Sequence, residues 1–104
     1  MRQFDVLTNT DAQSAQWAPY LIALQHDLLN DLDTVVVAPL FREGEGPRPL
    51  RSLNPIVEFS GERLVVSTQE LAGVSRRHLG GIVGTLEAER DALIHALDLL
   101  FTGV

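Results

Sequence analysis

The sequence predicts a mainly β domain of the α+β class, in which an antiparallel sheet or small barrel is closed by one C-terminal helix. Short runs of β-branched and apolar residues alternate with turn residues over much of the chain. Apolar residues recur at helical spacing only near the carboxyl end. Because 104 residues suffice for one core but not two, residues 1–104 are expected to form a single domain.

The first three expected strands lie before residue 40. Residues 3–8 alternate between apolar and polar side chains, as a half-buried strand does. Residues 20–25 and 34–38 are apolar on both faces and are expected inside the body. Residues 27–33 are too short and too rich in Asp and Asn for a lasting helix, so they predict a turn or one helical turn. Residues 42–49 alternate Gly and Pro with charge and predict an exposed loop.

A β-hairpin is expected next, with strands at residues 56–60 and 63–67. They are joined by Gly61-Glu62, a two-residue turn with Gly first, which is typical of a type II′ turn. This turn would fix the register and put one apolar set on a single face. The expected cross-strand pairs are Ser60 with Arg63, Phe59 with Leu64, and Val57 with Val66.

One helix is expected at the carboxyl end. It would open near Gly84-Thr85, after a turn at Gly80-Gly81, with glutamates in the first turn where the helix dipole favours negative charge. Gly103 can supply the left-handed residue that ends a helix. Core packing is expected for the apolar stripe, which consists of Leu86, Leu93, Ile94, Leu97, Leu100 and Phe101.

Charge and composition exclude several classes of function. A formal net charge of −6 would repel a phosphate backbone, so no direct nucleic-acid ligand is expected. The absence of cysteine excludes disulfides, thiol catalysis and cysteine zinc sites. The chain starts without an apolar signal stretch, and no apolar run approaches the roughly 20 residues of a membrane helix. We therefore expect a cytoplasmic protein with no membrane partner.

The histidines and glycines form no catalytic or cofactor motif. Imidazole and carboxylates cluster only at His26, Asp27, Asp31 and Asp33, where a turn with solvated carboxylates is expected because a metal site needs a folded constellation. His78 and His95 have no nucleophile motif beside them, and residues 80–84 match no phosphate-binding fingerprint. No catalytic residue, metal or cofactor is expected, which leaves a binding protein or an enzyme assembled from distant residues.

The last eight residues, Leu97–Val104, form an amphipathic segment that runs straight into the carboxyl end of the sequence. Terminal residues fray unless something holds them. Thr102, Gly103 and Val104 extend past the expected helix, where little of a small domain remains to cover them. They are therefore expected to contact a partner or a dimer mate.

Six segments in order carry a resemblance over nearly the whole chain. They are Gln3–Val6, Leu24–Leu29, Thr34–Leu40, Leu53–Val57, Gln69–Ala72 and Leu97–Val104. Their order, spacing and total length are similar to those of the CcdB family of plasmid-addiction toxins. The resemblance implies an SH3-like small antiparallel barrel with a wing hairpin and a C-terminal helix, forming a symmetric homodimer. The MazF group of toxins shares that fold.

The resemblance also implies a function. Toxins similar to this chain belong to type II toxin-antitoxin systems. They bind the dimerisation domain of the A subunit of DNA gyrase and trap the cleaved DNA-gyrase complex, without covalent chemistry of their own. A disordered segment of the antitoxin CcdA wraps the toxin and removes it from gyrase. The expected partners are thus a CcdA-like antitoxin, the A subunit of DNA gyrase, and a second copy of the chain.

Carried over residue by residue, the family's gyrase-contacting terminus Trp-Gly-Ile falls on Thr102, Gly103 and Val104. Gly103 matches, Val104 is one methylene shorter, and Thr102 replaces an aromatic anchor whose loss predicts binding weaker by about thirtyfold or more. The other gyrase-binding positions that the resemblance implies are Leu28, Leu29 and Asp98, the last in place of an asparagine.

Two alternatives stay open. One is a MazF-like endoribonuclease, suggested by the shared fold and by Arg42, Arg48 and Arg51. The other is a chromosomal relative that no longer poisons gyrase and acts only as a binding module, which Thr102 would permit. The Gly44–Pro49 loop is expected to be an exposed linker, with antitoxin contact as the other interpretation.

Overall fold

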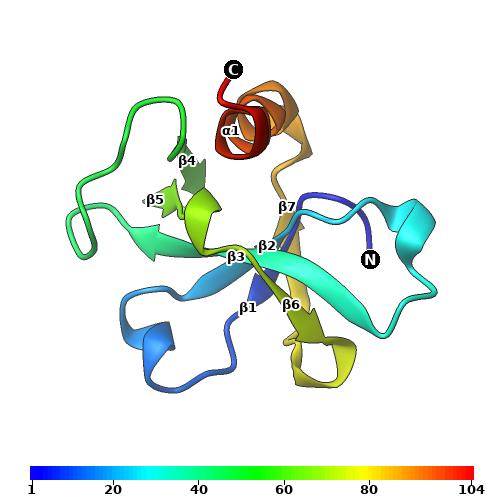
Figure 1. Ribbon diagram of the computed structural model, residues 1–104. Helices are drawn as coiled ribbons and strands as arrows, with labels where there is room; N and C mark the ends of the chain where they lie inside the picture. Colours follow the sequence, from blue (N-terminus) through cyan, green and yellow to red (C-terminus); the bar gives the residue numbers. More distant parts are fainter.

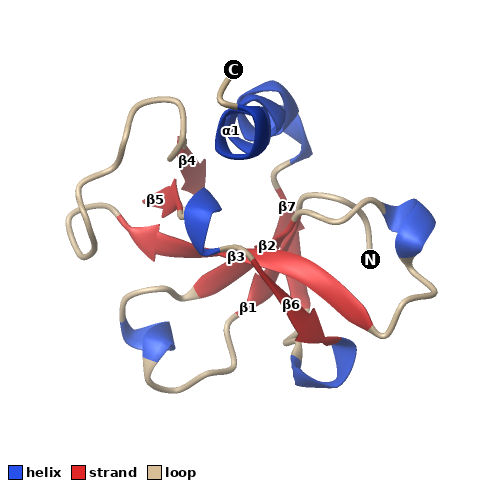
Figure 2. Ribbon diagram, in the orientation of Figure 1, coloured by secondary structure: helices blue, strands red, loops and turns tan.

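The computed structural model describes residues 1–104. Seven antiparallel strands form one sheet that curls into a half-barrel, and a single α-helix, α1 (Arg90–Thr102), lies at its open side (Figures 1 and 2). The predicted α+β fold class is therefore confirmed. The strands are β1 (Asp5–Thr8), β2 (Tyr20–Ala23), β3 (Thr34–Arg42), β4 (Ile56–Phe59), β5 (Glu62–Val66), β6 (Ala72–Ser75) and β7 (Ile82–Thr85). Short 3-10 turns are η1 (Ser14–Gln16), η2 (Asp27–Leu29), η3 (Thr68–Glu70), η4 (Arg76–His78) and η5 (Glu87–Glu89).

The long strand β3 organises the sheet, whose main path runs β4-β5-β3-β2-β1-β7. One edge of β3 pairs with β2, while the other pairs with β6 over Thr34–Val37 and with β5 over Leu40–Arg42. Pro39 lies at the gap between those two partners, and its carbonyl accepts a hydrogen bond from Ser67 on that same edge. A proline is tolerated there because no strand partner needs its missing N–H. The strand thus continues past the predicted end at residue 38.

The main core lies between the concave face of the sheet and α1. Phe4 and Val6 are both fully buried in it, although Phe4 precedes β1 and has φ 71°. The prediction that this strand is only half-buried is wrong, because Leu7 is fully buried in a second cluster on the opposite face. The helix contributes Leu93 to this cluster, with Ile94 and Leu97 packed against it. The remaining members come mainly from the strands: Ile22, Leu24, Ala38, Leu40, Val57, Leu64, Val66 and Leu86.

The wing hairpin β4–β5 forms as predicted, but its predicted register is wrong. Val57 pairs with Leu64 and Phe59 pairs with Glu62, a shift of two residues from the predicted pairs. The two turn residues are Ser60 and Gly61, both with positive φ (54° and 79°), as a type I′ turn requires. Because the shift is even, the predicted core face is unchanged.

Two strands and the helix start were not predicted correctly. Residues 72–75 pair with β3 as β6, although their glycine and small side chains carry little strand signal. Residues 82–85 pair with β1 as β7, so the helix cannot begin at Gly84-Thr85. The chain instead makes the turn η5 and enters α1 at Arg90. The glutamates of the predicted first helical turn lie in η5.

The helix ends where the sequence predicts. Gly103 has φ 75° and ψ 16°, and its N–H donates to the carbonyl of Leu99 at 3.0 Å. The predicted burial of Phe101 is wrong, since 68% of its surface is exposed. The last turn extends beyond the residues that cover Leu93 and Ala96, which are the two buried positions of the helix. No helix of the structure has the length and apolar content needed to cross a bilayer.

Candidate functional site

The carboxyl end of α1 presents a row of exposed residues. Asp98, Thr102, Gly103 and Val104 are all exposed, and Val104 retains 80% of its accessible surface. The hydroxyl of Thr102 donates to the Asp98 carbonyl one turn earlier at 2.6 Å, a local bond that helical threonines commonly make. The predicted terminal site residues are therefore accessible together on one turn and its extension.

Leu28 and Leu29 lie on η2, in the connection between β2 and β3. Leu28 is 86% exposed and Leu29 is 49% exposed, although both are large aliphatic side chains. Local hydrogen bonds build the turn: the Leu29 N–H donates to the His26 carbonyl, and the Asn30 N–H donates to the Asp27 carbonyl. The turn predicted from the Asp and Asn content is thus present, with one 3-10 turn inside it.

An apolar hollow of about 340 Å³ joins the predicted turn to the helix. Leu29 contributes from η2, while Leu97 and Phe101 contribute from successive turns of α1. Of the six predicted site residues, only Leu29 lines the hollow. We call the hollow, together with the exposed Leu28 and Val104, the helix-end surface. The full lining of the hollow is Leu24, Gln25, His26, Leu29, Val36, Leu71, Leu97 and Phe101.

Phe101 is the residue of this surface that the sequence analysis missed. The apolar stripe placed it in the core, because position 101 follows Leu93 and Leu97 at intervals of four. The exposure of Phe101 could have been predicted from its place on the last helical turn, two residues before the C-cap glycine Gly103. A helix end has fewer neighbours to cover it than a helix middle.

One acidic residue, Asp27, belongs to the η2 part of this surface. The pKa of Asp27 is lowered, first by a hydrogen bond from its own backbone N–H and less by the charges of His26 and Arg2. Its Oδ1 lies 3.8 Å from Nδ1 of His26. The side chain of Asp27 is therefore a carboxylate at neutral pH. The surface therefore offers apolar contacts with one carboxylate beside them on η2.

Of the arginines suggested for RNA contact, Arg42 is paired within the chain. Nε of Arg42 lies 2.7 Å from Oε1 of Glu62, and this hydrogen bond raises the pKa of Arg42. A second ion pair joins the neighbouring residues of the same two segments, with Nε of Arg63 2.9 Å from Oε1 of Glu43. These pairs neutralise two cations at the base of the 42–49 loop. Arg48 and Arg51 are not in a salt bridge.

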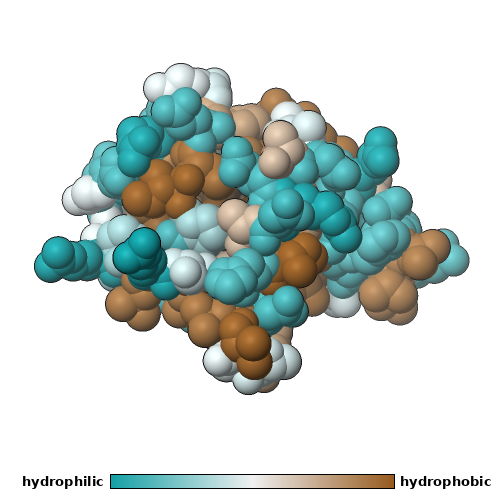
Figure 3. Space-filling view, turned by 90° about the horizontal axis from the view of Figure 1, so that it is seen from above, coloured by the Kyte–Doolittle hydropathy of each residue, from teal (hydrophilic) through white to brown (hydrophobic).

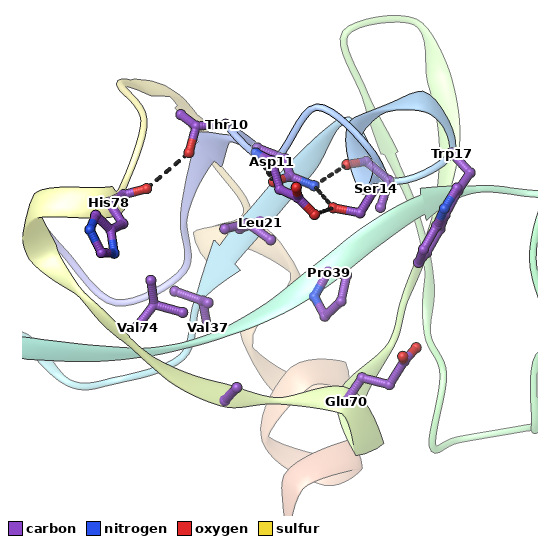
Figure 4. Close-up of a pocket in the computed structure, with 13 residues that line it drawn as sticks. Thr10, Asp11, Ser14, Trp17, Leu21, Val37, Pro39, Glu70, Val74 and His78 are labelled. Carbon is purple, nitrogen blue, oxygen red and sulfur yellow. Dashed lines mark hydrogen bonds between the residues drawn. The ribbon is translucent and has the colours of Figure 1, made fainter.

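A second hollow, of about 330 Å³, lies on the other face of β2 and β3 (Figure 4). Its floor is apolar and comes mainly from Leu21, Val37, Pro39, Ala72 and Val74. Asp11 and Ser14 stand on one side and Glu70 on the other, while the Trp17 ring stands at one end (Figure 4). We call this the β2–β3 groove. No residue of the predicted site lines it.

The groove's polar margin is held by local hydrogen bonds. The Ser14 hydroxyl donates to Asp11 Oδ2 at 2.8 Å, which is the largest cause of the lowered pKa of Asp11. The Thr10 hydroxyl donates to the His78 carbonyl at 2.9 Å and ties the two loops of that end together. Neither Asp11 nor Glu70 forms a salt bridge within the chain. Their charges are available to a bound molecule.

Comparison with known proteins assigns the chain to a family. A family model described as CcdB protein matches residues 3–103. A search of the curated proteins finds no match. Because the family match covers nearly all of the 104 residues, the chain belongs to the CcdB family, whose members act as toxins of toxin-antitoxin systems.

Proposed function

We propose that this protein is the toxin of a type II toxin-antitoxin system and that it binds the dimerisation domain of the A subunit of gyrase, trapping the cleaved DNA-gyrase complex. The observation that carries the proposal is the apolar hollow lined by both Leu29 and Phe101. Close to them in the sequence, Leu28 and Val104 are also exposed. Family membership supports a toxin role, and the resemblance of the terminus supports gyrase as its target.

The exposure of the apolar side chains of the helix-end surface indicates a role in binding a partner, not in stabilising the fold. Large apolar residues left in water gain little for the free protein but supply anchors at an interface, where aromatic residues contribute most. Seen from the side of α1, hydrophobic side chains gather in separate patches with hydrophilic ones between them (Figure 3). Such a pattern suits a partner that contacts a few apolar anchors and satisfies polar groups around them.

The proposed action needs no covalent chemistry by this chain. His78 and His95 lie on different elements, η4 and α1. The endoribonuclease alternative depends on Arg42, Arg48 and Arg51, of which Arg42 is paired with Glu62. A net charge of −6 also opposes RNA binding. We therefore propose a non-enzymatic toxin that acts in the cytoplasm as a homodimer.

The β2–β3 groove supports the antitoxin part of the proposal. An extended, basic segment of a CcdA-like antitoxin can place an apolar side chain on the floor between Leu21 and Val74. The carboxylates of Asp11 and Glu70, which accept hydroxyl hydrogen bonds but form no salt bridge, attract its positive charges. The groove and the helix-end surface share no lining residue. Antitoxin can therefore bind the groove while gyrase is still bound.

Binding to a gyrase A fragment tests the main proposal. Phe101→Ala and Leu29→Ala are each expected to weaken binding by about thirtyfold or more, since each removes an interface anchor. Ile82→Ala is the matched control, because Ile82 is an exposed apolar residue (55%) on β7 that lines neither hollow. Equal loss in all three variants would contradict the assignment of the surface.

Two activity assays separate the alternatives. The proposal expects purified protein to stabilise cleaved DNA in the presence of gyrase and to leave RNA intact. RNA cleavage without a gyrase effect would favour the endoribonuclease. Neither activity, together with tight binding of an antitoxin peptide, would favour the non-poisoning relative. Sedimentation at micromolar concentration tests the proposed dimer.

A further inference from the structure

The side chain of His26 caps the turn that presents Leu28 and Leu29. His26 is the N-cap residue of η2, with φ −65° and ψ 143°. Its Nδ1 accepts a hydrogen bond from the Leu28 N–H at 3.0 Å. Short polar side chains are the usual acceptors at this position. An imidazole can replace them only while Nδ1 carries a lone pair.

The rest of the turn is held by bonds that do not involve the imidazole. Nε2 of Gln25 donates to the carbonyls of Leu29 and Thr34, at 3.3 and 3.1 Å. Nδ2 of Asn30 donates to the carbonyl of Met1 at 2.7 Å. The Leu28 N–H, in contrast, has only the His26 side chain as its acceptor. His26 therefore controls Leu28 without controlling the whole connection.

Protonation removes this acceptor. Both nitrogens of an imidazolium carry protons, so Nδ1 must then donate and can no longer accept from the Leu28 N–H. The acceptor nearest in sequence is Asp27, whose Oδ1 is already 3.8 Å from Nδ1. A small rotation of either side chain would turn this contact into a hydrogen bond. The two protonation states thus select different partners for the same nitrogen.

We propose that His26 is a pH-dependent positioning residue, which holds Leu28 for partner binding when neutral and releases it when protonated. The inference about binding rests on the proposed function, because Leu28 belongs to the helix-end surface. Loss of one cap corresponds to about a fivefold change in the equilibrium between the held and the released position of Leu28. Histidine is the side chain that ordinarily changes charge between pH 5 and 8.

Few charged groups face His26. Its own turn supplies Asp27, and the N-terminal segment supplies Arg2, whose charge acts on Asp27. The other residues that line the hollow with His26 are all uncharged. They come from the segment after β2, from η2, from β3, from the segment after η3 and from α1. On α1 the ionisable residues nearest in sequence to Leu97 are His95 and Asp98, and neither lines the hollow. Asp27 is therefore the group expected to compete for the imidazole.

The test is an NMR titration of the free protein from pH 8 to pH 5.5, followed by binding to a gyrase A fragment over the same range. The Leu28 amide is expected to shift and to lose hydrogen-exchange protection with the same midpoint as the His26 ring. The wild type should bind about fivefold more weakly at the acid end, relative to His26→Ser. His26→Ser and His26→Asn keep a cap that does not titrate.

His26→Ala completes the design, since it should bind weakly at every pH and show no Leu28 transition. Comparing variants at each pH cancels the titration of gyrase itself. A Leu28 amide that ignores the His26 midpoint, or a wild type and His26→Ser with the same pH profile of binding, would overturn the proposal. Absence of gyrase binding at all pH values, with the Leu28 transition intact, would overturn the proposed function instead.

Discussion

Gly84 of β7 lies against the ring of Phe59 of β4, so closely that a Cβ added to Gly84 would be 2.5 Å from Cε1 of that ring. These two strands are the opposite ends of the main strand path. Their contact therefore shows how far the sheet curls. Tyr20 packs edge-on against the same ring, with centroids 5.1 Å apart, and completes the closure.

Replacement of Gly84 by alanine is expected to destabilise the fold by about 1–3 kcal/mol, because the new methyl group must displace a packed aromatic ring. Thermal or denaturant unfolding measures this change. Gly81→Ala is the control: no atom lies within 4 Å of its added Cβ, so its effect should stay within about 0.5 kcal/mol. Equal effects of the two variants would contradict the close contact.

The wing turn yields a prediction that distinguishes the two registers. Ser60→Asn should stabilise the protein by about 0.5 kcal/mol, because Asn followed by Gly is favoured where both residues have positive φ. Glu62→Asn should destabilise it, since Glu62 is a strand residue that binds Arg42. In a turn centred on Gly61-Glu62 the order would be reversed, and unfolding curves of both variants decide the matter.

The Glu43–Arg63 pair predicts part of the acid sensitivity. A hydrogen bond from Arg63 lowers the pKa of Glu43 below its unfolded value. Its contribution to stability is therefore complete above the unfolded pKa and is lost as pH falls through the lower folded pKa. Glu43→Gln should lower stability slightly at pH 7 and flatten the slope of stability against pH in the acid range. An unchanged slope would show that the pair contributes nothing in solution.

Thr102→Trp should strengthen gyrase A binding by about thirtyfold or more, because it adds an aromatic anchor to an exposed position. Binding to the gyrase A fragment and growth arrest on expression are the measurements. Thr102→Ala controls for loss of the hydroxyl bond to Asp98. Arrest by the tryptophan variant alone would indicate that this terminus has decayed, whereas arrest by both wild type and variant would show that threonine suffices.

Ala72→Phe should block the β2–β3 groove. Ala72 lines its floor and is exposed, so a larger side chain fills the space without disturbing the core. Affinity for a CcdA-like antitoxin peptide is expected to fall by about tenfold or more, with gyrase A binding unchanged. Val83→Phe, an exposed position on β7 outside the groove, is the control. Loss of gyrase binding in place of antitoxin binding would overturn the assignment of the groove.

The alternation of apolar and polar residues predicted which face of a strand is buried better than it predicted which residues pair across strands. Alternation correctly placed Val57, Leu64 and Val66 in the core, because the period of two survives an even shift of register. The register itself depends on backbone torsions of Ser60 that residue type does not determine. Strand β7 was hidden because its conformation depends on pairing with β1, which lies far earlier in the chain.

For the candidate site, sequence resemblance proposed the terminal residues and the Leu28-Leu29 pair, which the structure shows to be exposed, but it did not predict the hollow lined by Leu29 and Phe101. Periodicity assigned Phe101 to the core, since it cannot show that a helix extends past the body that it covers. The cap from His26 to Leu28 was also missed, because histidine is an uncommon N-cap and its acceptor role depends on ring orientation. The roles of all these residues in binding remain predictions.

The pairing of β1 with β7 has a consequence for the timing of synthesis. Residues 5–8 leave the ribosome early but cannot complete their side of the sheet until residues 82–85 have been made. The helix that carries Phe101, and Val104 beyond it, are translated later still. A nascent chain therefore lacks both the finished scaffold and the binding surface. If the helix-end surface binds gyrase as proposed, gyrase binding can begin only after translation has passed the helix.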